Sequence, residues 1–114
     1  MEFSIINSIK GDFANCEVDN KIESTDEFLN IIVNSPEETI ILKKDSFSDH
    51  FYDLKTKLAG EMLQKLVNHK MRLIILGDFN NITSNSLRDF IFESNRQGKI
   101  IFADNLDEAV EFLK

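Results

Sequence analysis

Three short apolar segments place the tightest limits on how this chain can fold. They are residues 39–42 (TIIL), 71–76 (MRLIIL) and 99–103 (KIIFA). Strands that are apolar along their whole length are typical of parallel sheets, which are covered on both faces. Amphipathic segments separate the three, and this alternation predicts parallel strands joined by right-handed helical crossovers. We therefore expect an α/β fold in which the three strands lie side by side, run the same way and are sandwiched between helices.

The N-terminal segment adds a hairpin to this arrangement. Residues 2–9 and 13–18 are two further apolar runs, separated by the turn residues KGD. Two such runs around a short polar turn predict a pair of antiparallel strands. If side chains alternate along the first strand, Phe3 and Ile5 face the core. The sheet is then mixed, and the predicted element order is ββαβαβαβα.

Capping residues mark the start of two helices. Ser24 precedes a segment with helical apolar spacing, and Glu27 follows it three residues later, which is the pattern of a capping box. That helix should end just before Pro36, because the residue preceding a proline disfavours helical geometry. Asn105, followed by Glu108, marks the start of a last short helix in the same way.

The longest amphipathic segment covers residues 49–69. Its apolar side chains recur every three or four residues, and this spacing predicts one continuous helix. Gly60 lies in the middle and costs about 1 kcal/mol relative to Ala. A close approach of this helix to the sheet or to another helix would offset that cost.

One further helix follows the strand at residues 71–76. Thr83, Ser84 or Ser86 caps its start, and Ser86 also begins a capping-box pattern. Gly98 is well suited to end the same helix, since glycine commonly adopts the left-handed conformation found just after a helix. Residues 51–95 thus form a helix–strand–helix unit, and we expect the other segments to pack around it.

The chain is acidic and has the length of one domain. Its 114 residues carry a formal net charge of −7. A chain of this length forms one core without disulfides, so we expect a single α/β domain over residues 1–114. An acidic surface repels phosphate backbones, which argues against nucleic-acid binding. No segment resembles a signal peptide or is apolar enough to span a membrane, so we expect a cytoplasmic protein without a membrane partner.

Residues that hold metals or attack substrates are sparse. Cys16 has no other cysteine to pair with, and we expect it to be a small buried side chain in a strand. His50 and His69 are 19 residues apart, which is about 28 Å if both lie on one helix and too far to share a metal. The sequence has neither a glycine-rich phosphate loop nor a nucleophile–base pair. We therefore expect no metal or other cofactor, and we assign no catalytic residue.

Polar side chains follow two of the predicted strands. In open α/β sheets, ligands bind at the carboxyl ends of the strands, so an Asp and a nearby Lys at that edge can bind a polar ligand or transfer protons. The alternative is structural: Asp78 caps a loop, Lys55 pairs with it, and Glu61 reaches a lysine at the protein boundary. The candidate ligand-binding or partner-binding residues are Asp45, Ser46, Asp53, Lys55, Thr56, Glu61 and Asp78.

One set of residues in the central part of the chain carries a resemblance to a known family. It comprises Phe51, DLKT at 53–56, LAGE at 58–61, LQK at 63–65, Asn68, GDF at 77–79, SLRDF at 86–90 and ESN at 93–95. In these residues the chain resembles a bacterial family, the domain of unknown function DUF4180. Members of that family often have glycine where this chain has Lys57. The resemblance extends over roughly 45 residues, and we expect it to cover the whole chain; it implies the fold unit and no particular chemistry.

The predicted element order is also similar to that of the STAS domain, the fold of anti-sigma-factor antagonists. STAS domains carry a phosphorylated serine in a Phe-x-Asp-Ser-Ser-Gly segment, whereas here Leu54 follows the Phe51-Tyr52-Asp53 segment. Ser46, Ser48 or Thr56 would have to replace that serine. The resemblance implies a mixed sheet and a role in regulation through protein binding.

Three functions follow from these observations. The first is a small regulatory module that binds a protein partner. The second is a small-ligand-binding protein or an enzyme that uses Asp78, Lys55, Thr56 and Glu61 at the carboxyl edge of the sheet. The third is a homodimer built on an exposed helix or an edge strand.

Overall fold

The computed structural model describes residues 1–113, which form a five-stranded sheet in the order β1-β2-β3-β4-β5. β1 pairs antiparallel with β2, and the other neighbouring strands are parallel. The mixed α/β sheet is therefore confirmed, with the three apolar segments adjacent and running the same way. The strands are Glu2–Ser8 (β1), Gly11–Glu17 (β2), Thr39–Lys43 (β3), Arg72–Leu76 (β4) and Ile100–Ala103 (β5).

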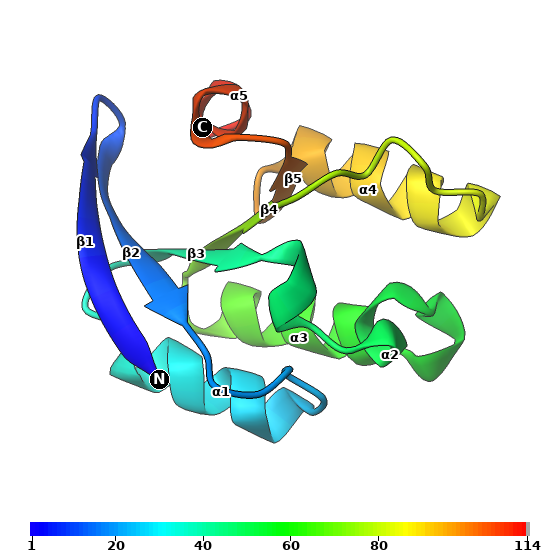
Figure 1. Ribbon diagram of the computed structural model, residues 1–114, viewed down its shortest axis with the longest axis horizontal. Coiled ribbons are helices and arrows are strands. Elements are labelled where there is room, and N and C mark those ends of the chain that lie inside the picture. Colours follow the sequence, from blue (N-terminus) through cyan, green and yellow to red (C-terminus); the bar gives the residue numbers. More distant parts are fainter. Residues whose placement is uncertain (114) are drawn as a thin grey trace.

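The helices are divided unequally between the two faces of the sheet. α1 (Thr25–Asn34), α3 (Leu58–Asn68) and α4 (Asn85–Gln97) pack on one face, and α5 (Leu106–Glu111) packs on the other. Figure 1 shows α5 on the opposite side of the sheet from α1 and α3. Right-handed crossovers between successive neighbouring strands place their helices on one face, and only the connection after β5 turns to the other.

Both faces of the central strands are buried. Ile40 and Leu42 pack in the cluster formed with α1, α3 and α4, whereas Ile41 packs in the cluster formed with α5. Ile75 and Ile74 divide in the same way along β4. Since neither face meets solvent, apolar residues occupy successive positions of each strand.

β1 lies at one edge of the sheet and packs mainly on β2. Phe3 contacts the main core cluster, as expected. Ile5 is 47% exposed, so the expectation that it faces the core is wrong. Ile5 packs in neither core cluster, whereas Phe3 on the same strand does.

The helix caps predicted at Ser24 and Asn105 are confirmed. The Ser24 hydroxyl accepts a hydrogen bond from the Glu27 backbone N–H (3.1 Å), and the Asn105 side chain accepts one from the Glu108 N–H (2.9 Å). The Glu27 carboxylate accepts a hydrogen bond from the Glu23 N–H (2.8 Å). In the predicted capping box it would accept from the Ser24 N–H instead. These side chains replace the partners that the first N–H groups of a helix lack.

Ser84 caps α4. Its hydroxyl accepts a hydrogen bond from the Leu87 N–H (3.2 Å). The capping box expected from Ser86 is wrong, because Ser86 already lies inside the first turn of α4. Gly98 follows the helix with a left-handed φ of +78°, as predicted.

The continuous helix predicted over residues 49–69 is wrong, because the chain breaks it into three parts. These are α2 (Asp49–Tyr52), a 3₁₀ turn (Leu54–Thr56) and α3. Asp53 is extended, and its carboxylate accepts a hydrogen bond from the Lys55 N–H (3.1 Å). An Asp side chain that bonds to nearby backbone competes with the helical pattern, and the apolar periodicity alone does not register this.

Two expectations depended on that single helix. The spacing given for His50 and His69 does not apply, because they lie in α2 and at the end of α3. Gly60 is exposed, and a Cβ built on it would have no atom within 4 Å, so the close approach expected there is wrong. Lys57, which separates the 3₁₀ turn from α3, has a left-handed φ of +67° that glycine adopts more readily.

Candidate functional site

Lys44 crosses the carboxyl ends of β3 and β4. It opens a 3₁₀ turn, Lys44–Ser46, directly after β3. Its Nζ donates a hydrogen bond to the Asp78 carbonyl oxygen (2.5 Å) and lies 5.0 Å from the centre of the Phe79 ring. A Cβ added to Gly77 would lie 2.5 Å from the Lys44 Cβ. The absence of a side chain at Gly77 therefore allows the two exit segments to touch.

A polar hollow of about 360 Å³ surrounds this contact. Several of its groups already have partners inside the molecule. The Asp78 carboxylate accepts a hydrogen bond from the Asn80 N–H (2.9 Å), and the Asp45 carbonyl accepts one from Lys21 Nζ (3.1 Å). The hollow is lined by Lys43, Lys44, Asp45, Leu76, Gly77 and Asp78.

The structure brings two of the seven candidate residues into this hollow, Asp45 and Asp78. Ser46 lies beside them, and its hydroxyl accepts a hydrogen bond from the Lys43 N–H (3.3 Å). Lys55 does not line the hollow. The structural alternative in which Lys55 pairs with Asp78 therefore needs correction, since Lys44 makes that contact and reaches the backbone carbonyl.

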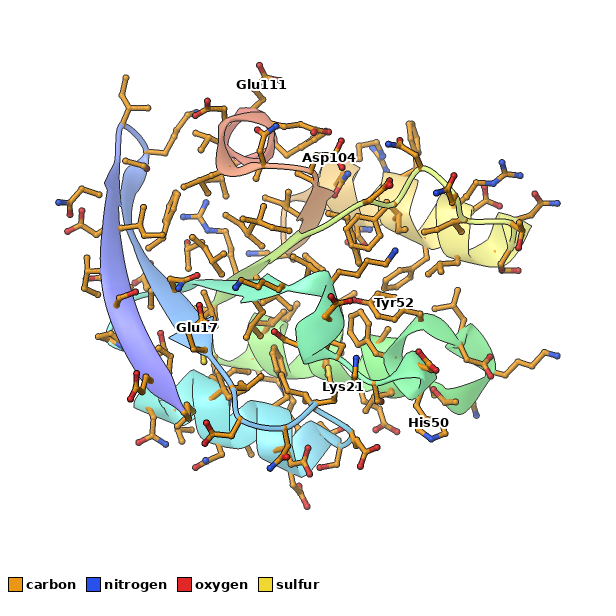
Figure 2. The ribbon with its side chains drawn as sticks, in the orientation of Figure 1. Glu17, Lys21, His50, Tyr52, Asp104 and Glu111 are labelled. Carbon is orange, nitrogen blue, oxygen red and sulfur yellow. The ribbon has the colours of Figure 1, made fainter. Side chains whose placement is uncertain are left out.

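Three other candidates belong to the connection between α2 and α3. Asp53 and Lys55 bond to each other within the 3₁₀ turn, through the Asp53 carboxylate and the Lys55 backbone N–H. The Thr56 hydroxyl lies 2.6 Å from the His50 carbonyl oxygen, to which it donates. Figure 2 shows the His50 side chain pointing away from the body of the molecule. These contacts hold the connection in shape.

Glu61 lies on the exposed side of α3, away from the core. Its carboxylate accepts a hydrogen bond from the Thr25 hydroxyl (2.8 Å), which links α3 to α1. The expected lysine partner is therefore replaced by a threonine. Ser48, named with Ser46 and Thr56 as a substitute for the STAS serine, is only 5% exposed, and within residues 1–113 its hydroxyl has no hydrogen-bond partner.

The helix arrangement explains why the carboxyl edge has a shallow hollow between β3 and β4. Ligand crevices in open α/β sheets form where neighbouring strands send their connections to opposite faces. β3 and β4 both lead to helices on the same face, α3 and α4. Their connections therefore run side by side and contact each other through Lys44 and Gly77.

Tyr52 contacts the turn that Lys44 opens, and Figure 2 labels its side chain. Its hydroxyl donates a hydrogen bond to the Lys44 carbonyl oxygen (2.7 Å). Burial raises the pKa of Tyr52 well above its ordinary value, and the nearby negative charge of Asp45 adds to the increase. The ring is edge-on to Phe51 and also contacts Phe79. This side of the turn is thus packed with aromatic rings.

Cys16 is buried, as the sequence predicted. Burial raises the pKa of its thiol to about 11, while the N-terminal ammonium group lowers it and Glu17 raises it further, both by smaller amounts. The reactive thiolate is therefore scarce near neutral pH. Within residues 1–113, no three His, Cys, Asp or Glu side chains are grouped so that they could hold a metal ion.

A second hollow, of about 430 Å³, lies between α4 and α5 and is predominantly apolar. Phe92 projects from α4 and is 72% exposed. Phe112 and Leu113 line the opposite side, after the last turn of α5. Figure 2 shows Glu111 pointing outward at the end of α5. This apolar hollow is lined by Phe92, Asn95, Arg96, Glu111, Phe112 and Leu113.

Asn95 closes the edge of the sheet at this hollow. Its side-chain amide donates to the Phe102 carbonyl oxygen (3.1 Å) and accepts from the Phe102 N–H (2.7 Å). Through these two hydrogen bonds, Asn95 binds the outer edge of β5. Beside it, Arg96 and Glu93 form an exposed ion pair, which lowers the pKa of Glu93.

Sequence reasoning missed the apolar hollow, although one signal was present. The inner face of α4 consists of Leu87, Phe90, Ile91 and Ser94, which are buried or partly buried. Phe92 lies off that face, among polar residues. Aromatic residues are enriched at the buried centres of protein interfaces, so an aromatic ring on the polar side of a helix is a signal that the sequence offered.

The comparisons with known proteins identify a family and nothing narrower. The family model described as domain of unknown function (DUF4180) matches residues 10–113, which is nearly the whole chain. No curated protein and no solved structure matches the chain. No helix within residues 1–113 combines the length and apolar character required to cross a membrane. This chain belongs to the DUF4180 family.

Proposed function

We propose that this domain works as a STAS-like regulatory module in the cytoplasm and that it acts by binding another protein. The observation that carries the proposal is the apolar hollow between α4 and α5, with the exposed Phe92 in its wall. Binding in this hollow needs no conformational change in the sheet, since the surrounding elements are helices packed on it.

The apolar hollow has the character of a protein contact surface. Its walls carry Phe92 and Phe112, and aromatic residues are enriched in the buried centres of protein interfaces. Arg96 and Glu111 supply a charged rim. An apolar centre inside a charged rim is the usual anatomy of a contact that buries one or two large anchoring side chains.

The charge around the hollow indicates the chemistry of the partner. α5 carries Asp107, Glu108 and Glu111 and has no basic residue, while Arg96 is already paired with Glu93. The chain as a whole has a net charge of −7. Opposite charges steer partners together and like charges reject them. The partner segment we propose therefore carries a large apolar side chain flanked by lysine or arginine.

Further support comes from how polar groups are used elsewhere. The candidate residues Asp53, Thr56 and Asp78 all bond to backbone groups of their own connections. Groups that are engaged in this way are held for structure and are poorly available for substrate. The order of elements, a hairpin followed by parallel strands with helical crossovers, is what the resemblance to STAS modules implies.

Selection from a random peptide display library on the full-length domain tests the proposal. We expect enriched peptides that combine a bulky apolar residue with Lys or Arg. Phe92→Ser should weaken binding of a selected peptide at least about tenfold, as loss of an interface anchor does. Backbone NMR shifts on titration should concentrate in α4 and α5. Because the charges act across the rim, affinity should also fall as salt is raised.

The matched control is Val33→Ser. Val33 is likewise exposed, at 61%, but lies on α1. Its replacement should leave peptide affinity unchanged. Equal binding to the wild type and Phe92→Ser, or NMR shifts confined to other elements, would rule out this surface as the binding site.

The polar hollow supports a second candidate, binding of a small polar ligand at the carboxyl edge. Lys43 and Asp45 both line it and carry opposite charges. A thermal-shift screen of small charged metabolites would reveal such a ligand, and Asp45→Ala should then abolish the shift. A ligand whose stabilisation survives Asp45→Ala does not use this hollow.

A further inference from the structure

The two edges of the sheet are protected to different extents. β5 is four residues long, and Asn95 occupies both the N–H and the carbonyl of Phe102 at its outer edge. β1 is seven residues long, and among residues 1–113 only β2 pairs with it. An unpaired strand edge is a template on which another strand can form backbone hydrogen bonds.

β1 also lacks the features that usually prevent such pairing. Its sequence, EFSIINS, contains one charged residue, Glu2, and no lysine, arginine or proline. Natural edge strands are commonly protected by lysine, proline or a bulge. The regular register with β2 has no bulge. Ile5, in the middle of the strand, is 47% exposed.

We infer that β1 pairs antiparallel with β1 of a second copy of this chain, which joins the two sheets into one. Pairing of all seven residues places Ile5 opposite Ile5 of the second copy, since it is the central residue of Glu2–Ser8. Glu2 then lies opposite Ser8, so no like charges face each other in the paired strands. The two exposed Ile5 side chains meet at the two-fold axis and are buried together.

A second copy fits this edge because the contact closes on itself. Antiparallel pairing of identical strands uses the same surface on both partners and ends at a dimer. A chain of molecules joined head to tail would need β1 of one copy to pair with β5 of the next. Asn95 already occupies the Phe102 groups on β5. The low charge of β1 also makes it the place where two acidic molecules approach with little repulsion.

This dimer uses a surface separate from the apolar hollow, so it does not depend on the proposed function. The interface is small, and we expect dissociation in the micromolar range. Analytical ultracentrifugation of the full chain from about 1 μM to about 500 μM should show a monomer–dimer equilibrium. Ile5→Lys should shift the midpoint at least about tenfold to higher concentration, because two like charges then face each other.

Two controls separate this contact from others. Val33→Lys adds the same charge at an exposed site on α1 and should leave the equilibrium unchanged. Phe92→Ser should also leave it unchanged. In addition, Ile5→Cys should form a disulfide-linked dimer on mild oxidation, while Val33→Cys should not; the native Cys16 is buried and does not compete.

Several outcomes would overturn the inference. A monomer at every concentration excludes self-association. A dimer that survives Ile5→Lys, or one that Phe92→Ser dissociates, places the contact elsewhere. Continued growth beyond a dimer would show that the β5 edge is not closed as we infer. Circular dichroism of each variant confirms that the fold is retained before its mass is interpreted.

Discussion

The two hollows of this domain differ in what their side chains already do. The polar hollow at the ends of β3 and β4 contains charged groups that bond to the protein itself, such as Lys44 to the Asp78 carbonyl. The apolar hollow between α4 and α5 contains Phe92, which is 72% exposed. A charged group engaged internally contributes to the fold, whereas an exposed aromatic ring gains most when a partner covers it.

This difference teaches that residue type alone does not tell which side chains the fold itself has already engaged. The polar hollow attracted attention in the sequence because Asp45 and Asp78 follow strands. The structure places them in connections that contact each other. This contrast between the two hollows predicts that substitutions in the polar hollow change stability. Substitution of Phe92 in the apolar hollow should change binding with little effect on stability.

The largest effect should come from Gly77→Ala. Its Cβ would lie 2.5 Å from the Lys44 Cβ, so one exit segment must move. Overpacking of this kind costs about 1–3 kcal/mol, and we expect the upper end because the contact is next to the backbone of Lys44. Urea unfolding measures the change. Gly60→Ala is the matched control, since it meets open space and should stabilise α3 by up to about 1 kcal/mol.

Asn95→Leu should lower the free energy of unfolding by about 2 kcal/mol, since the N–H and carbonyl of Phe102 both lose their partner. It tests whether Asn95, which lines the apolar hollow, serves the fold. Chemical denaturation of the variant provides the measurement. Gln97→Leu, an exposed change on the same helix, should alter stability by less than about 0.5 kcal/mol. Equal effects of the two substitutions would show that Asn95 is not a special tether.

Tyr52→Phe should cost about 1 kcal/mol through loss of the hydrogen bond to the Lys44 carbonyl. It also tests a pH dependence. The folded state keeps the phenol proton above the ordinary pKa of 10.0, so it binds more protons than the unfolded state there. Stability must therefore fall as the pH rises above about 10. Tyr52 is the chain's one tyrosine, so tyrosinate absorbance reports it directly, and ionisation before unfolding would contradict the burial argument.

The smallest effect on stability should come from Phe92→Ser. Exposed side chains without internal partners usually change the free energy of unfolding by less than about 0.5 kcal/mol. Thermal unfolding of this variant beside the wild type measures the difference. A loss above about 1 kcal/mol would mean that Phe92 already packs within its own molecule, and the contrast between the two hollows would disappear.

Several features of the fold could be predicted because they depend on residues close together in the chain. Ser24 and Asn105 cap helices through N–H groups three residues away. The apolar runs form parallel strands because their composition requires cover on both faces. Even here, Ser84 and Ser86 could not be distinguished, since both lie near the start of α4 and only the backbone conformation selects one.

The break between α2 and α3 shows where local patterns are insufficient. Apolar residues continue at helical spacing through Phe51 and Leu58, so the pattern predicts one helix. The competing bonds made by Asp53 and Thr56 interrupt it, and Lys57 takes a left-handed conformation. The strength of these hydrogen bonds depends on how the whole connection packs against the core.

The chain by itself determined the strands, most helix ends and the mixed order of the sheet, because periodicity and capping act over a few residues. Only the tertiary structure decided what each surface is free to do. Lys44 meets Gly77, Asn95 meets Phe102, and Phe92 and Phe112 line one hollow only once the sheet has assembled. A side chain is available to a ligand or partner when no distant part of its own chain has engaged it, and that condition is set by the three-dimensional packing.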